Sequence, residues 1–357
     1  MNVQMLGSEW FAARPGGLNR YFESLWEALR RTAGPTIGAA AFGEAPEGGT
    51  SLGPAKMSLP RRLQAGHAWG RLIQDGELVD LHFALYARAA LAGMPAGRTI
   101  CHFHGPWAAE SIIGGDARMK ARAKKRVEVS VLRRANGVVA LSSQFADILL
   151  RDYRVPLDRI SVIPGGVDID RFKPADGTQP QEKQVVAVRR LEDRMGLDVL
   201  LRSWPTVMSR HPDARLLVIG EGSARGRLEV LTTSLGLEGS VRLVGRRSDD
   251  YVVNAYRESA VSVVPSIALE GFGLIALESL ACGTPAVVTR CGGLPGVVEP
   301  LSPELVADVG DPGDLARRIA GALDGDAPSA VECRKYAESF SWDRVAGDHL
   351  DLYRSLG

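Results

Sequence analysis

The feature that most constrains the fold is a regular alternation of short apolar runs and helical stretches in the second half of the chain. Apolar runs without polar interruption are typical of strands that are covered on both faces of a sheet. A repeated strand and helix unit predicts a doubly wound parallel α/β sheet. We expect strands near residues 185–188, 214–220, 241–245, 260–266 and 285–289, and helices at 197–210, 225–235 and 274–282.

The first half of the chain repeats this scheme less clearly. Strands are expected near residues 3–6, 99–102 and 137–141, and a helix at 18–31. A single hydrophobic core rarely grows beyond about 250 residues, so a length of 357 residues predicts two domains. The fold class that we expect is therefore α/β, with two Rossmann-like doubly wound parallel-sheet domains that face a cleft.

The boundary between these domains is expected near residues 168–183. Its later part, 174–183, is rich in proline, glycine and polar residues, as linkers are. The first domain then comprises residues 1–167 and the second 168–340. Apolar residues recur at helical spacing in the stretch 341–357, and we expect this helix to cross back and complete the first domain.

Composition and charge exclude several classes of protein. A hydrophobic content of 45% with 24% charged residues is typical of a globular chain rather than a disordered or fibrous one. The net charge of +1 gives no overall attraction to nucleic acid, so no nucleic-acid partner is expected. No apolar run approaches the roughly 20 residues of a membrane span and the first residues lack a signal-peptide pattern, so we expect a cytoplasmic location. The four scattered cysteines have neither metal-ligand nor disulfide-framework spacing.

One local departure from this even charge lies at residues 118–134, which are dense in lysine and arginine. A basic helix of this kind is either a solvated face or a surface for weak contact with a membrane. Both interpretations remain open from the sequence.

The most informative motif is EGFGLIALESLACG at residues 270–283, directly after an expected strand. A glycine-rich turn there presents backbone N–H groups at the start of the next helix, where phosphate binds. Gly271 and Gly273 let the backbone approach a diphosphate. Glu270 stands at the mouth of the loop and Glu278 about two helical turns further, so the two carboxylates lie near one helix face. One would meet a transferred sugar and the other the hydroxyls of a ribose.

This motif resembles that of glycosyltransferase family 4, whose members carry two glutamates separated by seven residues around a GFG-like turn. The resemblance implies the GT-B fold and an enzyme that transfers a sugar from a nucleotide diphosphate donor. It also implies that Glu270 contacts hydroxyls of the donor sugar and that Glu278 contacts the ribose. The amides near Gly273 and Leu274 would hold the donor phosphates, and Gly271 and Phe272 would also belong to the donor site.

Other segments extend the resemblance over nearly the whole chain. VIPGGVDIDRF at 162–172 is similar to the family's segment at the interdomain junction, and CGGLPGVVE at 291–299 is similar to a loop after a later strand. LVIGEGSAR and VRLVGRRSDDYVVNAY are similar to two further strand and loop units. In the second of these, Gly245 and Arg246 would lie against the nucleotide base.

Two features of the first half are candidate site residues. Gly16 and Gly17 precede an expected helix, where backbone amides suit a distal phosphate or the acceptor, although a glycine pair is also an ordinary turn. His104 resembles the family's cleft histidine and follows a strand, at the end where α/β sheets place their ligands. His102 is more simply interpreted as a buried, hydrogen-bonded histidine.

The segment VRRLEDRMGLDVL at 188–200 resembles the family's phosphate-binding turn G-R-L-x-x-x-K-G but departs from it twice. Arg190 matches the family arginine, whereas Arg189 replaces the glycine and Met195 replaces the lysine. Either Arg194 supplies the missing charge or Arg190 acts alone. An arginine fork suits a diphosphate in either case.

The function implied by the resemblance is a retaining hexosyltransferase that moves a hexose or amino-hexose to a small-molecule or glycan acceptor. The catalytic candidates are His104, Arg190, Arg194 and Glu270. No DxD metal motif lies between strands, so we expect no metal and no cofactor beyond the nucleotide sugar, with a UDP-sugar favoured over a GDP-sugar. Two alternatives remain, a nucleotide-sugar 2-epimerase of the same fold and a non-catalytic nucleotide-sugar-binding partner.

Overall fold

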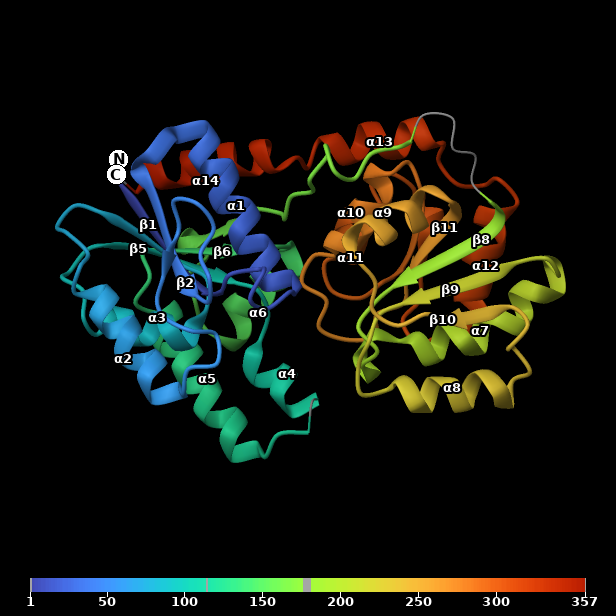
Figure 1. Ribbon diagram of the computed structural model, residues 1–357, viewed down its shortest axis with the longest axis horizontal. Helices are drawn as coiled ribbons and strands as arrows, with labels where there is room; N and C mark the ends of the chain where they lie inside the picture. The colour runs from blue at the N-terminus through green and yellow to red at the C-terminus, as the bar shows by residue number, and fades with distance from the viewer. Residues whose placement is uncertain (1, 114, 176–180, 357) are drawn as a thin grey trace. The chain divides into compact units, whose positions relative to one another are not determined.

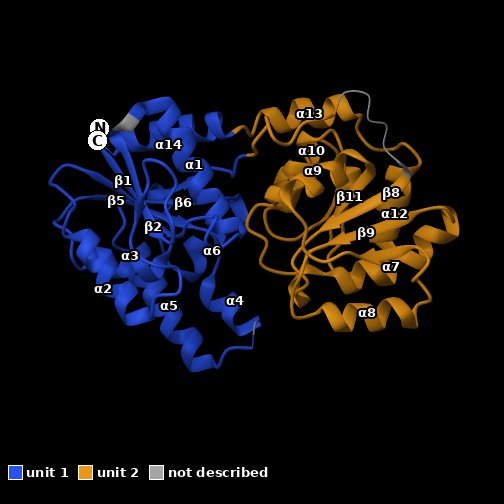
Figure 2. Ribbon diagram, viewed as in Figure 1, with its two compact units in different colours: residues 1–166, 342–357 blue, residues 167–341 orange. Residues whose placement is uncertain are grey.

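The computed structural model describes residues 2–113, 115–175 and 181–356, which divide into two compact units. Unit 1 comprises Met1–Gly166 and Trp342–Gly357, and unit 2 comprises Val167–Ser341 (Figure 2). Each unit is built around its own parallel sheet, with helices on both faces (Figure 1). The doubly wound parallel α/β class expected from the sequence is therefore confirmed.

Unit 1 contains a seven-stranded sheet of order β3-β2-β1-β4-β5-β6-β7, in which every neighbouring pair is parallel. Its strands are β1 Val3–Glu9, β2 Ile37–Phe42, β3 Thr50–Ser51, β4 Leu78–Leu81, β5 Arg98–Phe103, β6 Gly137–Ala140 and β7 Ile160–Val162. Its helices are α1 Gly17–Ala33, η1 Gly34–Thr36, α2 Leu59–Gly70, α3 Ala84–Leu91, α4 Trp107–Ile113, α5 Arg118–Leu132, α6 Ser143–Asp152, η2 Leu157–Arg159 and α14 Trp342–Ser355.

The two faces of the unit 1 sheet differ in character. On one face, alternating residues such as Val79, Leu81 and Phe103 pack in an apolar core with residues from α3, α5 and α6. On the other face, α14 packs beside α1 (Figure 1). The apolar residues of α1 recur every three to four positions, as in Phe22 and Leu25, so one side of this helix is buried.

Unit 2 contains a six-stranded parallel sheet of order β10-β9-β8-β11-β12-β13. Its strands are β8 Gln181–Val188, β9 Arg215–Ile219, β10 Val241–Leu243, β11 Ser259–Val264, β12 Ala286–Thr289 and β13 Val306–Ala307. Its helices are η3 Asp193–Met195, α7 Leu197–Arg210, α8 Arg225–Ser234, α9 Asp249–Arg257, α10 Leu274–Ala281, α11 Leu294–Val298, η4 Pro303–Leu305, α12 Pro312–Leu323 and α13 Ala330–Glu338.

Helix starts in unit 2 follow local capping chemistry. The Asp311 side chain accepts from the backbone N–H of Gly313 at 2.8 Å and fixes the start of α12. Ser329 and Glu332 form a reciprocal capping box at the start of α13. By contrast, α7 and α10 begin after the left-handed glycines Gly196 and Gly273 and have no side-chain cap.

Two expectations about elements were wrong or incomplete. The segment 174–183 was expected to be a linker, but β8 already begins at Gln181, whose backbone pairs with Ser259 of β11; residues 176–180 lie outside the described part of the chain. The strands β2 and β4 were not expected, because one consists of small residues (IGAAAF) and the other is only four residues long and contains Asp80.

None of the helices in the described ranges combines the length and apolar character that a membrane crossing needs.

Candidate functional site

The carboxyl ends of the unit 2 strands carry the loops that the sequence motifs single out, at the sheet edge where α/β folds bind ligands. The loop after β11 leads into α10, whose first residue is Leu274. Gly273 precedes it with φ +97 and offers no side-chain cap, so the first N–H groups of the helix are left to another partner. This is the arrangement that the glycine-rich motif predicts.

At the carboxyl ends of the unit 2 strands, the backbones of neighbouring loops are in direct contact. An ideal Cβ at Gly220 would lie 1.8 Å from the carbonyl oxygen of Arg189, and one at Gly196 would lie 1.9 Å from that of Pro265. Such distances are far below any real contact, so only glycine fits at these positions. The same holds for Gly292, which has φ +61, because an ideal Cβ there would lie 1.8 Å from the carbonyl oxygen of Glu270.

Glu270 is held by two donors in this edge. Its Oε2 accepts from Arg189 Nη2 at 2.5 Å and from Ser266 Oγ at 3.1 Å. Burial works to raise the pKa of Glu270, but the charge and hydrogen bonds of Arg189, the Ser266 hydroxyl and the charge of Arg194 outweigh it, and the pKa is lowered. Glu270 is therefore ionised at neutral pH.

The three arginines of the loop after β8 differ in burial and in their partners. Arg189 is buried and binds Glu270, whereas Arg190 is exposed. The guanidinium of Arg194 turns toward the same loop and donates to the carbonyl of Leu269 at 3.1 Å. Leu269 has φ +52, a conformation that non-glycine residues rarely adopt. The arginine that meets Glu270 directly is thus one that the sequence interpretation passed over.

The remaining candidates of unit 2 lie on the same loops. Glu278 is partly buried on α10, and Phe272 is buried with its ring 6.1 Å from that of Phe340. Gly245 has φ +76, and its carbonyl accepts from Gly220 N at 3.0 Å, so this turn joins the loop after β9. The Arg246 side chain is exposed.

Unit 1 holds the other three candidates. Gly16 and Gly17 are exposed at the start of α1, which has no side-chain cap, and a Cβ at either position would meet nothing within 4 Å. His104 follows β5, and its ring lies 4.9 Å from the ring of Tyr21 on α1. The loop, the helix and the histidine therefore belong to one edge of the unit 1 sheet.

His104 ends a column of buried polar side chains that the sequence did not predict. Parallel pairing of β4 with β5 places His82 beside His102, with ring centroids 3.9 Å apart and planes inclined by 20°. Asp80 accepts from the His102 ring at 3.0 Å and from the Tyr353 hydroxyl of α14 at 2.5 Å. The additional members of this column, which we call the histidine stack, are His349 and Tyr21.

Burial sets the protonation of the histidine stack. Burial lowers the pKa of His102 and of His349 to about 4, against partial opposition from Asp80. The pKa of His104 is lowered as well, first by burial and then by the neighbouring histidines. The pKa of Asp80 lies well below its usual range, because the histidines outweigh the effect of burial. At neutral pH the rings of His102, His104 and His349 are therefore neutral, and Asp80 is ionised.

The stack also contains a triad with the spacing of a metal site. One ring nitrogen each of His82, His102 and His104 lies within 4.8 Å of the others. Ring lone pairs point along the ring plane, however, and these three planes are inclined to one another by only 19–30°. Nearly parallel planes do not converge on one ion, and His102 already binds Asp80. The triad is therefore better described as stacked imidazole rings.

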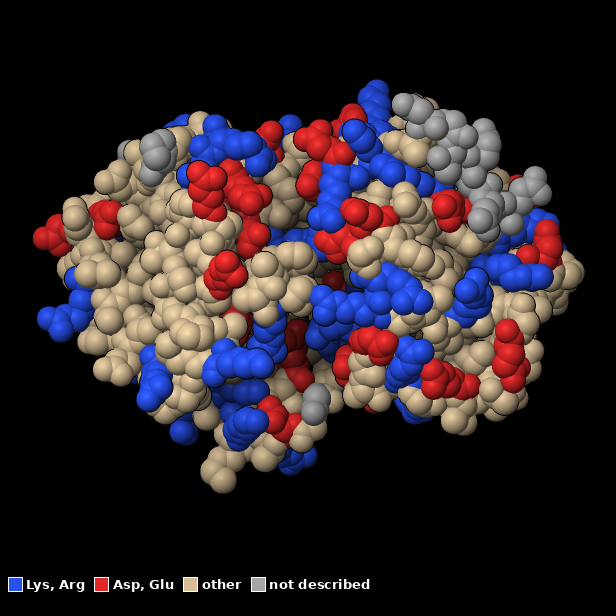
Figure 3. All heavy atoms as spheres, viewed as in Figure 1, with Lys and Arg blue, Asp and Glu red and all other residues tan. Residues whose placement is uncertain are grey.

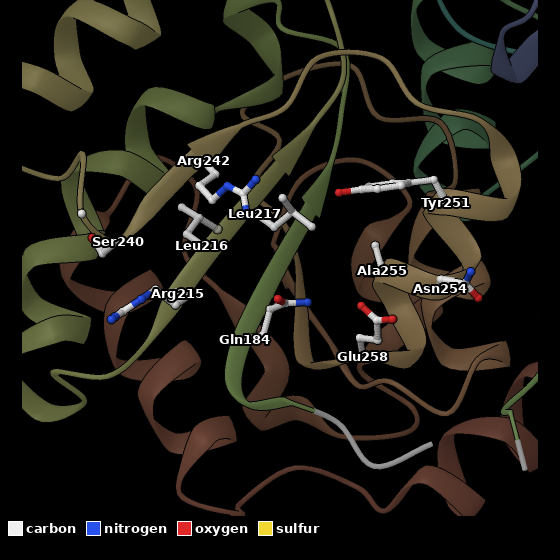
Figure 4. Close-up of a pocket in the computed structure, with 11 residues that line it drawn as sticks. Gln184, Arg215, Leu216, Leu217, Ser240, Arg242, Tyr251, Asn254, Ala255 and Glu258 are labelled. Atoms are coloured by element: carbon white, nitrogen blue, oxygen red, sulfur yellow. The ribbon is translucent and has the colours of Figure 1, made fainter. Parts of the chain in front are cut away.

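A pocket of about 520 Å³ lies elsewhere in unit 2 (Figure 4). Figure 4 shows Tyr251 and Asn254 of α9, with Glu258 directly after it, on one side, and Gln184 and Arg242 of the strands on the other. These strand residues do not lie in the loops at the carboxyl ends. None of the candidate residues lines this pocket, so we do not assign it to the donor.

Comparisons with known proteins agree with the motifs. Residues 168–340 match the family model described as glycosyl transferases group 1, and residues 15–171 match the model described as Glycosyltransferase Family 4. A D-inositol 3-phosphate glycosyltransferase of Corynebacterium jeikeium is 33% identical over 268 residues, which is 69% of this chain and 63% of that protein. One of Streptomyces scabiei is 28% identical over 86% of this chain and 75% of that protein. The chain thus spans about three fifths of the length of the first such relatives.

Solved structures share the fold over the whole chain. Sucrose-phosphate synthase from Thermosynechococcus elongatus superposes with a TM-score of 0.80 at 23% identity, covering 100% of this chain and 99% of that one. Anabaena HepE in complex with UDP superposes with a TM-score of 0.75 at 18% identity, covering 99% and 100%. These structures confirm the expected GT-B fold class.

Proposed function

The chain belongs to glycosyltransferase family 4, and from this premise we propose that it is a retaining glycosyltransferase that uses a nucleotide diphosphate sugar. The observation that carries the proposal is the edge of unit 2, where an ionised Glu270 lies beside two arginines and the uncapped start of α10. Unit 2 binds the donor in this proposal, and unit 1 binds the acceptor.

The chemistry follows from charge. When the bond from the anomeric carbon to the phosphate oxygen breaks, the electron pair stays on the nucleoside diphosphate and the sugar becomes cationic. Preorganised arginines and helix N–H groups stabilise that developing negative charge more than the ground state. The acceptor oxygen attacks from the same face, and its proton passes to the leaving phosphate oxygen. No metal is needed for this step if Arg190, Arg194 and the N–H groups at the start of α10 supply the positive charge.

Each candidate has a place in this proposal. Glu270 binds hydroxyls of the donor sugar, and Glu278 binds the ribose. We assign His104, at the edge of the unit 1 sheet, a catalytic role. The other residues that we assign to the donor are Gly16, Gly17, Gly245, Arg246, Gly271, Phe272, Gly273 and Leu274.

The donor base and the acceptor are proposed from relatives. Anabaena HepE was crystallised with UDP and with UDP-glucose, which favours a UDP-sugar here. The relatives named D-inositol 3-phosphate glycosyltransferase favour a small polar acceptor. A 2-epimerase of the same fold would change the donor in the absence of any acceptor, and a non-catalytic binding protein would leave it unchanged with every acceptor.

We expect Glu278→Gln to weaken binding of the nucleotide sugar by about 1–3 kcal/mol, because a charged hydrogen bond to the ribose is lost. Calorimetric titration with UDP-glucose in excess EDTA measures the change and tests metal independence in the same experiment. Glu229→Gln, on the exposed side of α8, serves as the matched control and should titrate like the parent protein. Equal affinities in the parent and Glu278→Gln would remove Glu278 from the site, and loss of parent binding in EDTA would show that a metal is required.

A second proposal concerns an acceptor reached at a membrane surface through the basic stretch 118–134. Lysine and arginine side chains gather over α5 in Figure 3. Beside them, Ile112 and Met119 are large apolar side chains with exposed fractions of 54% and 81%. Exposed apolar residues within a basic surface are typical of interfacial attachment.

We expect Met119→Glu to reduce co-sedimentation with vesicles of phosphatidylglycerol and phosphatidylcholine several-fold, because it removes an apolar contact and adds repulsion from anionic lipid. Leu72→Glu is the matched control, since Leu72 is also in unit 1 and 76% exposed. No binding of the parent protein to these vesicles at low salt would refute this proposal and leave α5 as a solvated face.

A further inference from the structure

The loop after β8 places a cation where the resembled motif does not have one. The motif carries glycine at the position of Arg189 and lysine at the position of Met195. In this chain Met195 is buried, with an exposed fraction of 4%, and Arg189 Nη2 lies 2.8 Å from its sulfur. A lysine side chain at 195 would extend its ammonium two bonds beyond the position of that sulfur. The guanidinium of Arg189 therefore fills the space of the missing ammonium.

The backbone explains why the two side chains meet. Arg189 N donates to the carbonyl of Ile219 at 2.9 Å, and its own carbonyl packs against Gly220, so the residue is fixed at the end of β8. The η3 turn, Asp193–Met195, then brings the chain back, with Met195 N donating to the carbonyl of Glu192 at 2.9 Å. Met195 thus returns to cover the side chain of Arg189.

The Arg189 side chain has one charged partner and one buried donor without a partner among the described residues. Its side chain is 5% exposed, and its Nη2 donates to the carboxylate of Glu270 and to Ser266 Oγ. Its Nε, also buried, has no hydrogen-bond partner among the described residues. A buried donor without a partner is costly, and such a group in a site points to an absent ligand. The charge of Arg194 also helps to lower the pKa of Glu270.

We propose that Arg189 supplies, from the end of β8, the positive charge that Met195 lacks, and that it binds the diphosphate of the nucleotide donor. This inference rests on the proposed function and adds a residue to it. The bonds made and broken are those of the transfer step described above, and the role of Arg189 is to stabilise the electron pair left on the phosphate oxygen. Its ion pair with Glu270 also keeps that carboxylate in place for the sugar.

The test separates contact with phosphate from contact with the rest of the nucleotide. UDP, GDP and ADP are titrated by calorimetry into the parent protein and into Arg189→Ala, each beside its own nucleoside, which lacks phosphate. We expect Arg189→Ala to weaken binding of the preferred diphosphate at least 10-fold and to leave the nucleoside affinity unchanged. Arg202→Ala, at an exposed position of α7, is the control and should bind like the parent.

Because Arg189 and Met195 are in contact, exchanging the charge between the two positions should restore diphosphate affinity. The double variant Arg189→Gly with Met195→Lys restores one cation in the same space, so it should recover most of the diphosphate affinity that Arg189→Gly loses. Arg189→Met keeps the buried volume without the charge, and it distinguishes loss of contact from loss of folding if Arg189→Ala does not fold.

Three outcomes decide between the possibilities. Unchanged diphosphate affinity in both Arg189→Ala and Arg189→Met overturns the inference. A larger loss in Arg194→Ala than in Arg189→Ala also overturns it and assigns the charge to Arg194. A parent protein that binds none of the three diphosphates contradicts the proposed function itself, which is a separate result.

Discussion

Glu270→Ala is expected to lower kcat at least about 100-fold and also to lower the free energy of unfolding of the protein by about 3–5 kcal/mol. The first effect comes from the lost contact to the donor sugar. The second comes from Arg189, whose buried guanidinium would lose its carboxylate partner. Initial rates with the nucleotide sugar and urea unfolding measure the two effects separately.

A surface ion pair provides the control for this prediction. Arg290 and Glu299 lie 3.0 Å apart, and both side chains are about half exposed. Pairs of this kind contribute roughly 0–1 kcal/mol, so Glu299→Ala should change stability little. If Glu270→Ala unfolds at the same urea concentration as Glu299→Ala, the Arg189 and Glu270 pair does not stabilise unit 2.

Acid is expected to destabilise unit 1 through the histidine stack. The folded-state pKa of His102 and of His349 is about 4, below the ordinary value of 6.5. The unfolded chain therefore takes up these protons first, and the free energy of unfolding falls as the pH drops from about 6.5 to about 4. At about 1.4 kcal/mol per pKa unit, each histidine contributes about 3 kcal/mol to this loss. Asp80, with a lowered pKa, adds a further loss below its ordinary value of 3.8.

Urea unfolding at pH 7.0, 5.5 and 4.5 checks this prediction. His349→Leu removes one of the proton-binding groups, so stability should depend less steeply on pH in this variant than in the parent. His67→Leu is the control, because the His67 side chain is exposed on α2. A pH dependence that is the same in all three proteins would mean that folding does not lower the pKa of His349.

The sequence predicts what is local in this protein. The strand, glycine turn and helix around Glu270 depend on neighbouring residues, and they were recognisable from their order along the chain. The histidine stack was not recognisable, because it depends on the register between β4 and β5 and on α14, whose Tyr353 is 273 residues from Asp80. Sequence spacing carries no information about a contact between residues so far apart in the chain.

Arg189 was missed for a different reason. Its replacement of glycine and the loss of lysine at Met195 were both visible, but they were treated as two separate departures from the motif. Only the η3 turn shows that the two side chains are in contact. A pair of departures a few residues apart, one gaining a cation and the other losing one, is a signal that sequence analysis can use.

The glycines that touch neighbouring carbonyls also limit how proteins like this one diverge. Gly196, Gly220 and Gly292 each lie against the backbone of another loop, so no loop of this edge can gain a side chain there without displacing the next. We therefore expect a change of donor preference in a descendant of this chain to arise by exchange of side chains at the carboxyl ends of the unit 2 strands. The backbone path of these loops should stay the same.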